Sequence, residues 1–405
     1  MGRIATVCLL LLACTGSAFA ASADGGDYLF VWASDVGSKT SDFLAVIDAD
    51  PRSPSYAEVI ATAPTGVANS VAHHTEHVMP AGGVLFANGF GAGQTFRFDL
   101  RDPTHPKVLG SLTNAGEYMH PHSFARTPSG TVLATYQMRG HDNAEPGALV
   151  ELSASGDVLR VSPAADAAVE PFIRPYSLAV VPALDRVVTT SADMHAKDVS
   201  HAVQLWRLSD LKLLKTIRLP AGPGKENEDP AEARVLGDGR TVVVSSFNCG
   251  LFLLSGLDGP AAAAKLIHAV GDGGECALPV VAGRYWVATD TKAGLISFDM
   301  TDPAHPREAH RLALPGGQQP HWIALAPDGR RIVISGGKGP LETRVLIARI
   351  DPKSGRLSID PRFRDPGASE PGVSFDRAAW PHGATGKALP HGAVFSRSSD
   401  QGERG

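Results

Sequence analysis

Short runs of alternating or continuous apolar residues recur along the chain, each ending in a polar turn. The clearest internal match pairs FDLRDPTHP at 98–106 with FDMTDPAHP at 298–306. Similar strand endings recur about every fifty residues, at 43–51, 96–103, 148–156, 203–210, 251–259, 295–303 and 345–352. A regular spacing of this length indicates a repeated structural unit.

Between these endings lie further β-rich runs that follow turn residues, at 128–136, 238–247, 283–290 and 328–336. Glycine at a turn followed by β-branched residues is typical of a hairpin. Four-stranded units of this size are typical of β-propeller blades, which must stack around a closed ring to bury both faces. Helix-period segments are nearly absent, which argues against doubly wound and TIM-barrel folds. We therefore predict an all-β, seven-bladed β-propeller that forms a single domain over residues 21–405.

The first twenty residues have a different pattern. Arg3 precedes an apolar run too short to span a bilayer, and Ala18-Phe19-Ala20 is typical of a cleavage site. We expect residues 1–20 to be a signal peptide and the protein to be periplasmic or secreted. The alternative, a lipidation site at Cys14, also places the protein outside the cytoplasm. No later apolar run is long enough for a membrane span.

Composition narrows the class of partner. The 43 glycines and 30 prolines suit a loop-rich β protein. The net charge is −5 and Lys and Arg form no block, so we expect no nucleic-acid partner. Small molecules and metal ions are the remaining classes.

Four cysteines indicate a possible disulfide. Cys8 and Cys14 leave with the signal peptide, so Cys249 and Cys276 remain. Two such cysteines in an oxidising compartment most often pair. The alternative is that one of them supplies a soft metal ligand, although their spacing is not that of a C-x-x-C metal site.

Histidines gather in a few segments, most densely in NSVAHHTEHVMP at 69–80. The groups are His73, His74 and His77; His120 and His122; His195 and His201; His321; and His382 and His391. Each group lies between one strand ending and the next hairpin, so we expect each on a different blade, facing the central channel. Imidazole suits copper, zinc, iron and nickel, and several such ligands make a metal site. His105 and His305 stand at equivalent places in the D-P-x-H-P repeat, and we interpret both as structural or solvated.

Two further residue types bear on the metal. Met79, Met119 and Met194 each stand within two residues of a candidate histidine, and thioether sulfur is a soft ligand for copper(I). The alternative for each methionine is core filling. Glu76, between His74 and His77, is a candidate hydrogen-bond partner for a metal ligand.

The chain resembles the selenium-binding protein and methanethiol oxidase family. FLAVIDADPRSPSYAEVI at 43–60 is similar to a family hallmark, and the His73-His74-Thr75 motif follows it, as in the family. His122 matches a family histidine, and 302–335 is similar to a segment that joins two late blades. The resemblance implies a β-propeller, histidine-bound metal and, in the bacterial oxidases, copper-dependent oxidation of methanethiol to formaldehyde, hydrogen sulfide and hydrogen peroxide.

The chain also departs from the family pattern. Pro80 stands near the place of a family cysteine, Ala125 replaces a second histidine, and Asp376-Arg377 replaces a His-Glu pair. The resemblance does not assign His321, His382 or His391 to the roles of these missing family residues.

Two interpretations of function follow. In the first, the chain is an exported enzyme that binds a small thiol such as methanethiol at copper. The predicted ligands are His73, His74 and His122, with one or two of His201, His321 and His391. In the second, it is a non-catalytic metal-binding or protein-docking propeller. A third, a lactonase, is suggested only by PHWIALAPDG and would need carboxylate-bound calcium.

Overall fold

The computed structural model describes residues 27–140, 145–195, 198–383 and 386–397. The predicted signal peptide, residues 1–20, lies outside these ranges. Within them, no helix has the length and apolar character that a membrane crossing requires. The described secondary structure is almost entirely β, with two short 3-10 turns at Pro182–Leu184 and Pro315–Gly317.

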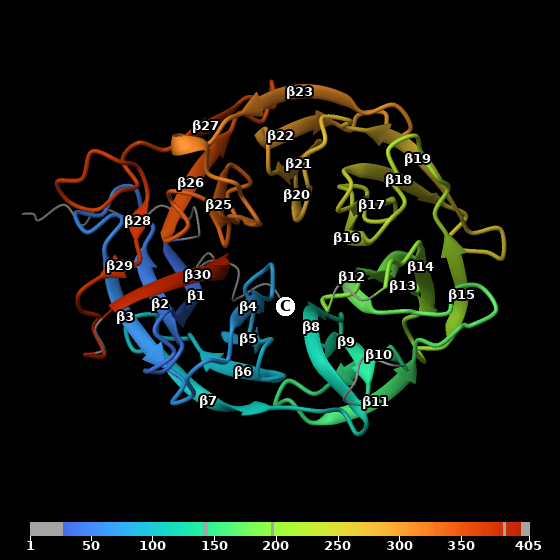
Figure 1. Ribbon diagram of the computed structural model, residues 1–405, viewed down its shortest axis with the longest axis horizontal. Helices are drawn as coiled ribbons and strands as arrows, with labels where there is room; N and C mark the ends of the chain where they lie inside the picture. The colour runs from blue at the N-terminus through green and yellow to red at the C-terminus, as the bar shows by residue number, and fades with distance from the viewer. Residues whose placement is uncertain (1–26, 141–144, 196–197, 384–385, 398–405) are drawn as a thin grey trace, which may run out of the picture.

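Seven antiparallel sheets stand around a central channel, as Figure 1 shows. The predicted all-β, seven-bladed β-propeller is therefore confirmed. Each sheet is one blade, and in each a strand faces the channel while the last strand lies on the outer wall. The innermost strands are β4 (Ala72–Thr75), β8 (Tyr118–Arg126), β12 (Pro175–Val181), β16 (Pro230–Val235), β20 (Pro279–Ala282), β24 (Trp322–Leu325) and β30 (Gly386–Phe395).

The strands outside them follow the same order in every blade. The second strands are β5 (Val84–Gly89), β9 (Val132–Arg139), β13 (Arg186–Ser191), β17 (Val242–Ser246), β21 (Tyr285–Asp290), β25 (Arg331–Ser335) and β1 (Tyr28–Asp35). The third strands are β6 (Gln94–Asp99), β10 (Glu145–Leu152), β14 (Ala202–Arg207), β18 (Gly250–Ser255), β22 (Gly294–Asp299), β26 (Arg344–Ile350) and β2 (Phe43–Asp48). The seven sequence repeats all fall on these third strands.

The outer strands are β7 (Lys107–Leu112), β11 (Val158–Pro163), β15 (Leu213–Arg218), β19 (Ala263–Ala269), β23 (Arg307–Leu312), β27 (Leu357–Ile359) and β3 (Val59–Pro64). Several of them are largely exposed, as in β7 and β11, whereas the third strands are mostly buried. Two short strands complete the set: β28 (Val373–Ser374) pairs with β26, and β29 (Asp376–Arg377) pairs with β30.

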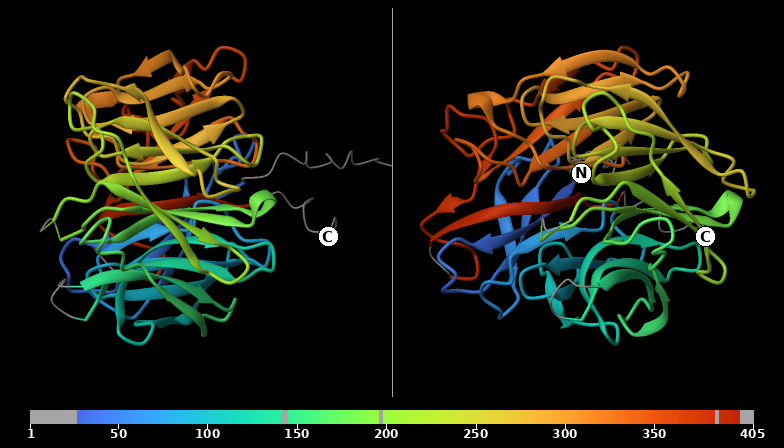
Figure 2. Two further views of the ribbon diagram at one scale, coloured as in Figure 1. Left: turned by 90° about the vertical axis from the view of Figure 1, so that its right-hand side faces the viewer. Right: turned by 45° about the vertical axis from the view of Figure 1, so that its right-hand side comes forward.

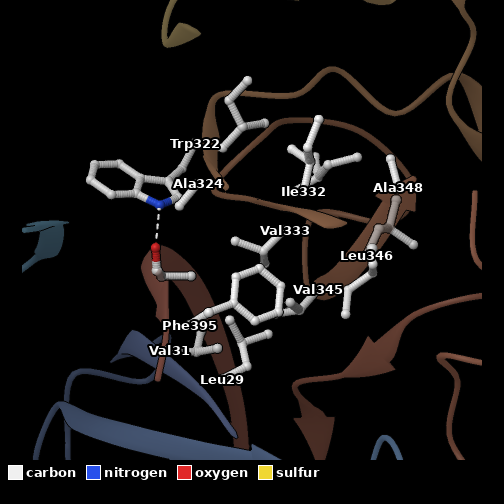
Figure 3. Packing of buried hydrophobic residues seen from close by; sticks show 14 of the residues in the cluster. Leu29, Val31, Trp322, Ala324, Ile332, Val333, Val345, Leu346, Ala348 and Phe395 are labelled. Atoms are coloured by element: carbon white, nitrogen blue, oxygen red, sulfur yellow. Dashed lines mark hydrogen bonds between the residues drawn. The ribbon is translucent and has the colours of Figure 1, made fainter. Parts of the chain in front are cut away.

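One blade closes the ring by joining the two ends of the chain. The C-terminal strand β30 pairs with β1, whose neighbours are β2 and β3. Figure 3 shows Phe395 of β30 packed beside Leu29 and Val31 of β1 and the buried side chains of β24–β26. The indole nitrogen of Trp322 donates a hydrogen bond of 2.8 Å to the carbonyl of Ala393. Burial of this apolar cluster links the closing blade to its neighbour.

The antiparallel order gives the ring two distinct faces, seen edge-on in Figure 2. Each innermost strand begins at the face where the second strand ends and the third begins. We call this the entrance face; it carries the starts of β4 and β8. The opposite face carries the ends of the innermost strands and the D-P-x-H-P turns. The position of a residue within its strand therefore decides which end of the channel it lies near.

Cys249 and Cys276 form a disulfide, as expected. It links the turn before β18 to the loop before β20, on neighbouring blades. Closing a loop of this size stabilises the fold by about 3 kcal/mol in the chain-entropy model.

Candidate metal centre

Five histidines from four blades meet inside the channel. His73 and His74 lie on β4, His122 on β8, His321 immediately before β24 and His391 on β30. Ligand atoms of His73, His74 and His122 all lie within 4.8 Å of one another, and so do those of His73, His321 and His391. His73 belongs to both groups, so the five imidazoles form one continuous cluster, which we call the inner cluster.

The inner cluster has buried nitrogen atoms that no described residue satisfies. They are Nδ1 of His73, Nε2 of His74, Nε2 of His122 and Nδ1 of His391. Leaving a buried polar group without a hydrogen bond costs about 1–3 kcal/mol. Four such atoms in one cluster need an explanation, and a bound cation is one that would satisfy members of each group.

Hydrogen bonds at the opposite edge of the rings set the tautomer. Nδ1 of His122 lies 2.8 Å from the carbonyl oxygen of Tyr176, so this nitrogen carries the proton and donates it. Nε2 of His122 therefore keeps its lone pair. The hydroxyl of Ser123 lies 3.1 Å from Nδ1 of His122 and 3.2 Å from Nδ1 of His74, and it connects the two rings. Such outer contacts are typical of metal-binding histidines.

The surroundings keep these imidazoles neutral. Burial lowers the pKa of His122 to about 3, despite the hydrogen bond to Tyr176. Burial, with a smaller contribution from Lys338, lowers the pKa of His321 to about 4. The pKa values of His73, His74 and His391 are also lowered well below their usual value, first by burial and then by the neighbouring histidines. Neutral imidazole is the form that binds a metal ion.

Close packing holds the rings. His73 and His74 stack with their ring centres 4.1 Å apart, and the indole of Trp322 lies 4.8 Å from His74. Gly392 lets β30 approach β4, because a Cβ there would lie 2.6 Å from the carbonyl oxygen of His73. The neighbouring His391 is thereby brought to the cluster, with its ring centre 4.4 Å from that of His73.

The donor set fits a copper or zinc ion. All five candidate ligands are imidazoles held on or beside the innermost strands of four blades, and imidazole suits either metal. Sulfur does not favour copper here: Met79 is buried in an apolar cluster, and Met194 packs against another that contains Tyr176. The alternative interpretation of these two methionines as core residues therefore fits the structure better.

His201 is outside the inner cluster, contrary to the interpretation that placed it among the candidate ligands. It precedes β14, the third strand of its blade, and its Nδ1 lies 3.8 Å from a carboxylate oxygen of Glu170. Its segment joins the second strand to the third, whereas the cluster is built on innermost strands.

Glu76 and His382 also lie apart from the inner cluster. Glu76 pairs with Arg126 at 2.7 Å and accepts a hydrogen bond from the backbone of Phe86. His382 lies 2.8 Å from the hydroxyl of Thr62 and packs on Phe43. His105 and His305, interpreted as structural or solvated, are exposed and pair with Asp102 and Asp302.

Several residues that matter to the site were not among the candidates chosen from the sequence. Ser123 lies beside His122 on β8 and also contacts His74. Tyr176 on β12 contacts His122, and Trp322 on β24 contacts His74. His77 stacks on Trp322 at 4.5 Å and receives a hydrogen bond of 3.0 Å from Arg234. His77 thus supports the cluster from the opposite face. Ser123 directly follows His122 and Trp322 directly follows His321, and these two adjacent pairs were the detectable signal.

The fold and the inner cluster together define a seven-bladed propeller with a histidine site in its channel. No family model matches the chain. It is 26% identical over 355 residues to the methanethiol oxidase of a Hyphomicrobium species, covering 80% of this chain and 77% of that protein. This match confirms the resemblance to the selenium-binding protein and methanethiol oxidase family.

Solved structures agree on the fold. A hypothetical selenium-binding protein from Sulfolobus tokodaii superposes with a TM-score of 0.70 at 16% identity, covering 93% of this chain and 95% of that one. A periplasmic gluconolactonase from Pseudomonas aeruginosa superposes with a TM-score of 0.61 at 15% identity, covering 92% and 97%. At these identities the two structures support the propeller fold alone.

Proposed function

We propose that this chain is a copper-dependent oxidase of small thiols such as methanethiol. The observation that carries the proposal is the inner cluster, in which five histidines from four blades converge and four buried imidazole nitrogens have no hydrogen-bond partner among the described residues. The related methanethiol oxidase supports the substrate class. The overall reaction would convert methanethiol, O₂ and water to formaldehyde, hydrogen sulfide and hydrogen peroxide.

The roles of the residues follow from their contacts. His73, His74, His122, His321 and His391 would hold the ion, which would supply a soft centre that binds sulfur as thiolate. The Tyr176 carbonyl and the Ser123 hydroxyl fix the orientation of His122 and His74. Because the imidazoles are already neutral, they would bind the ion without first losing protons.

The test is to measure metal content and thiol turnover on the same samples. Wild type reconstituted with copper is expected to retain near-stoichiometric metal by ICP-MS and to release hydrogen sulfide and hydrogen peroxide from methanethiol. His74→Ala/His122→Ala should lose both. His105→Ala/His305→Ala, which changes two exposed histidines, is the matched control and should lose neither. Wild type that retains no copper would refute the proposal.

A non-catalytic metal-binding role is the second candidate. Pro80 stands near the place of a family cysteine, so one side chain that the family carries is absent from this chain. Stoichiometric copper without any turnover of methanethiol would favour this role over an oxidase.

We also propose that the protein is exported, to the periplasm or beyond. The disulfide between Cys249 and Cys276 supports an oxidising compartment, because such bonds are rare in the cytosol. N-terminal sequencing of protein from the periplasmic fraction should give Ala21 as the first residue. A mature protein that still begins at Met1 would contradict export by a cleaved signal peptide.

A further inference from the structure

Two other histidines lie at the entrance face of the channel. His120 stands near the start of β8, and His195 lies in the segment between β13 and β14 of the next blade. Their ring centres are 5.4 Å apart and their planes nearly perpendicular, at 81°. Two imidazoles that share one copper ion at about 2.0 Å place their ring centres about 5–6 Å apart. The pair therefore has the separation of a two-ligand site.

Phe90 lies between this outer pair and the inner cluster. Its ring centre is 5.4 Å from that of His120 and 6.0 Å from that of His195. On the other side it is 5.6 Å from His73 and 5.8 Å from His122. One aromatic ring thus separates the two sets of histidines, and it belongs to the turn between β5 and β6.

One of the outer rings, that of His120, is held by its Nδ1 edge, as His122 is in the inner cluster. Nδ1 of His120 lies 3.2 Å from the carbonyl oxygen of Phe90, so it donates the proton and Nε2 keeps the lone pair. Nδ1 of His195 lies 3.8 Å from the carboxylate of Asp193, which accepts a hydrogen bond from the backbone N–H of His195. The carboxylate thus holds the backbone at His195 and adds negative charge near its ring.

The backbone at His120 is left-handed. Its φ is +55°, in a region where histidine, asparagine and aspartate are found more often than other residues with a side chain. The left-handed residue directly precedes the register shift of β8 between Pro121 and Phe124. Its ring contacts those of Phe90 and His195.

We infer that His120 and His195 form an outer metal-capture site through which a copper ion reaches the inner cluster. The inference rests on the proposed function, because the inner cluster must bind the ion that the outer pair delivers. Two imidazoles bind copper less tightly than the larger inner set, so transfer of the ion to the inner cluster lowers its free energy. The transfer is ligand exchange: bonds from Nε2 atoms of the outer pair break as bonds to inner nitrogens form, without change of oxidation state.

The test is the rate of copper loading. Apoprotein is mixed with copper(II) in a glycine buffer, which suppresses weak surface binding, and the quenching of tryptophan fluorescence is followed by stopped flow. Asparagine is the replacement of choice because it tolerates the left-handed backbone at position 120. His120→Asn/His195→Asn should load at least about tenfold more slowly than wild type and reach the same final stoichiometry by ICP-MS. Circular dichroism checks the fold of each variant.

His105→Asn/His305→Asn is the matched control, because it also removes two histidines that pair with aspartates. It should load at the wild-type rate. A wild-type rate in His120→Asn/His195→Asn would overturn the outer site while leaving the proposed function intact. A lower final stoichiometry in that variant would also overturn it, because the pair would then belong to the resident site. Wild type that retains no copper would instead refute the proposed function itself.

Discussion

The chain places histidines in two opposite settings. At the turns after β6 and β22, His105 and His305 have side chains that are 76% exposed, and each lies within 2.9 Å of an aspartate carboxylate. In the channel, His73, His74 and His122 are buried, and no carboxylate of the described residues pairs with them. The first pair is satisfied by its own turn. The second set has the same chemistry but lacks a negative partner, so it is suited to receive a cation.

The largest effect is expected when the histidine that belongs to both groups of candidate ligands is removed. His73 is the member common to both groups of three ligand atoms, so His73→Ala leaves neither group intact. Loss of an outer hydrogen-bond partner already lowers metal affinity by about 10–100-fold, so loss of this ligand should lower it by at least about 100-fold. Competition titration of copper against a chelator measures the change. His321→Ala, which disrupts one group, should cost less, and His305→Ala should cost nothing.

The second prediction concerns pH and the metal-free protein. The folded-state pKa of His122 is about 3, below its ordinary value of 6.5. The unfolded chain therefore takes up a proton that the folded chain excludes, and stability falls as the pH drops below 6.5. For His122 the loss between pH 7.5 and pH 5 is about 2 kcal/mol.

Urea unfolding with EDTA present checks this prediction at pH 7.5 and pH 5.0. His122→Gln should lose about 2 kcal/mol less than wild type over this range. His305→Gln should behave as wild type does, because its imidazole is exposed. An equal loss in wild type and His122→Gln would show that His122 is protonated in the folded protein.

The third prediction tests whether contacts at Nδ1 orient the rings of His74 and His122. Ser123→Ala removes the hydroxyl that lies between Nδ1 of His74 and Nδ1 of His122. Both rings keep their places on the strands but lose one orienting contact, so copper affinity should fall by about tenfold. Ser129→Ala, in the exposed turn after β8, is the matched control. Equal affinities in the two variants would mean that packing alone orients the rings.

The period of the apolar pattern was sufficient to predict the propeller. The seven repeated endings are the third strands of seven blades, each buried between two neighbours, so their apolar residues are dictated by position. The pairing of strands in the closing blade could not be predicted from the sequence pattern, because β30 and β1 come from opposite ends of the chain. The same holds for Tyr176 and Trp322, whose contacts with histidines depend on how neighbouring blades pack.

The candidate site was predictable to the extent that histidines precede or lie on innermost strands. His73, His74, His122, His321 and His391 satisfy that condition. His201 does not, because its segment joins a second strand to a third, and the sequence alone did not distinguish the two kinds of connection. A place on or directly before an innermost strand, rather than residue type, distinguishes the histidines of the inner cluster.

The smallest expected effect follows from this distinction. His201→Ala removes an imidazole that lies 3.8 Å from Glu170, a residue that also pairs with Arg218 at 3.1 Å. Because the arginine continues to satisfy the carboxylate, neither copper affinity nor stability should change measurably. A surface ion pair of this kind contributes at most about 1 kcal/mol to the free energy of unfolding. The same competition titration, run beside His321→Ala, measures the difference. A loss of affinity as large as that of His321→Ala would place His201 among the ligands and would mean that the channel rearranges when the ion binds.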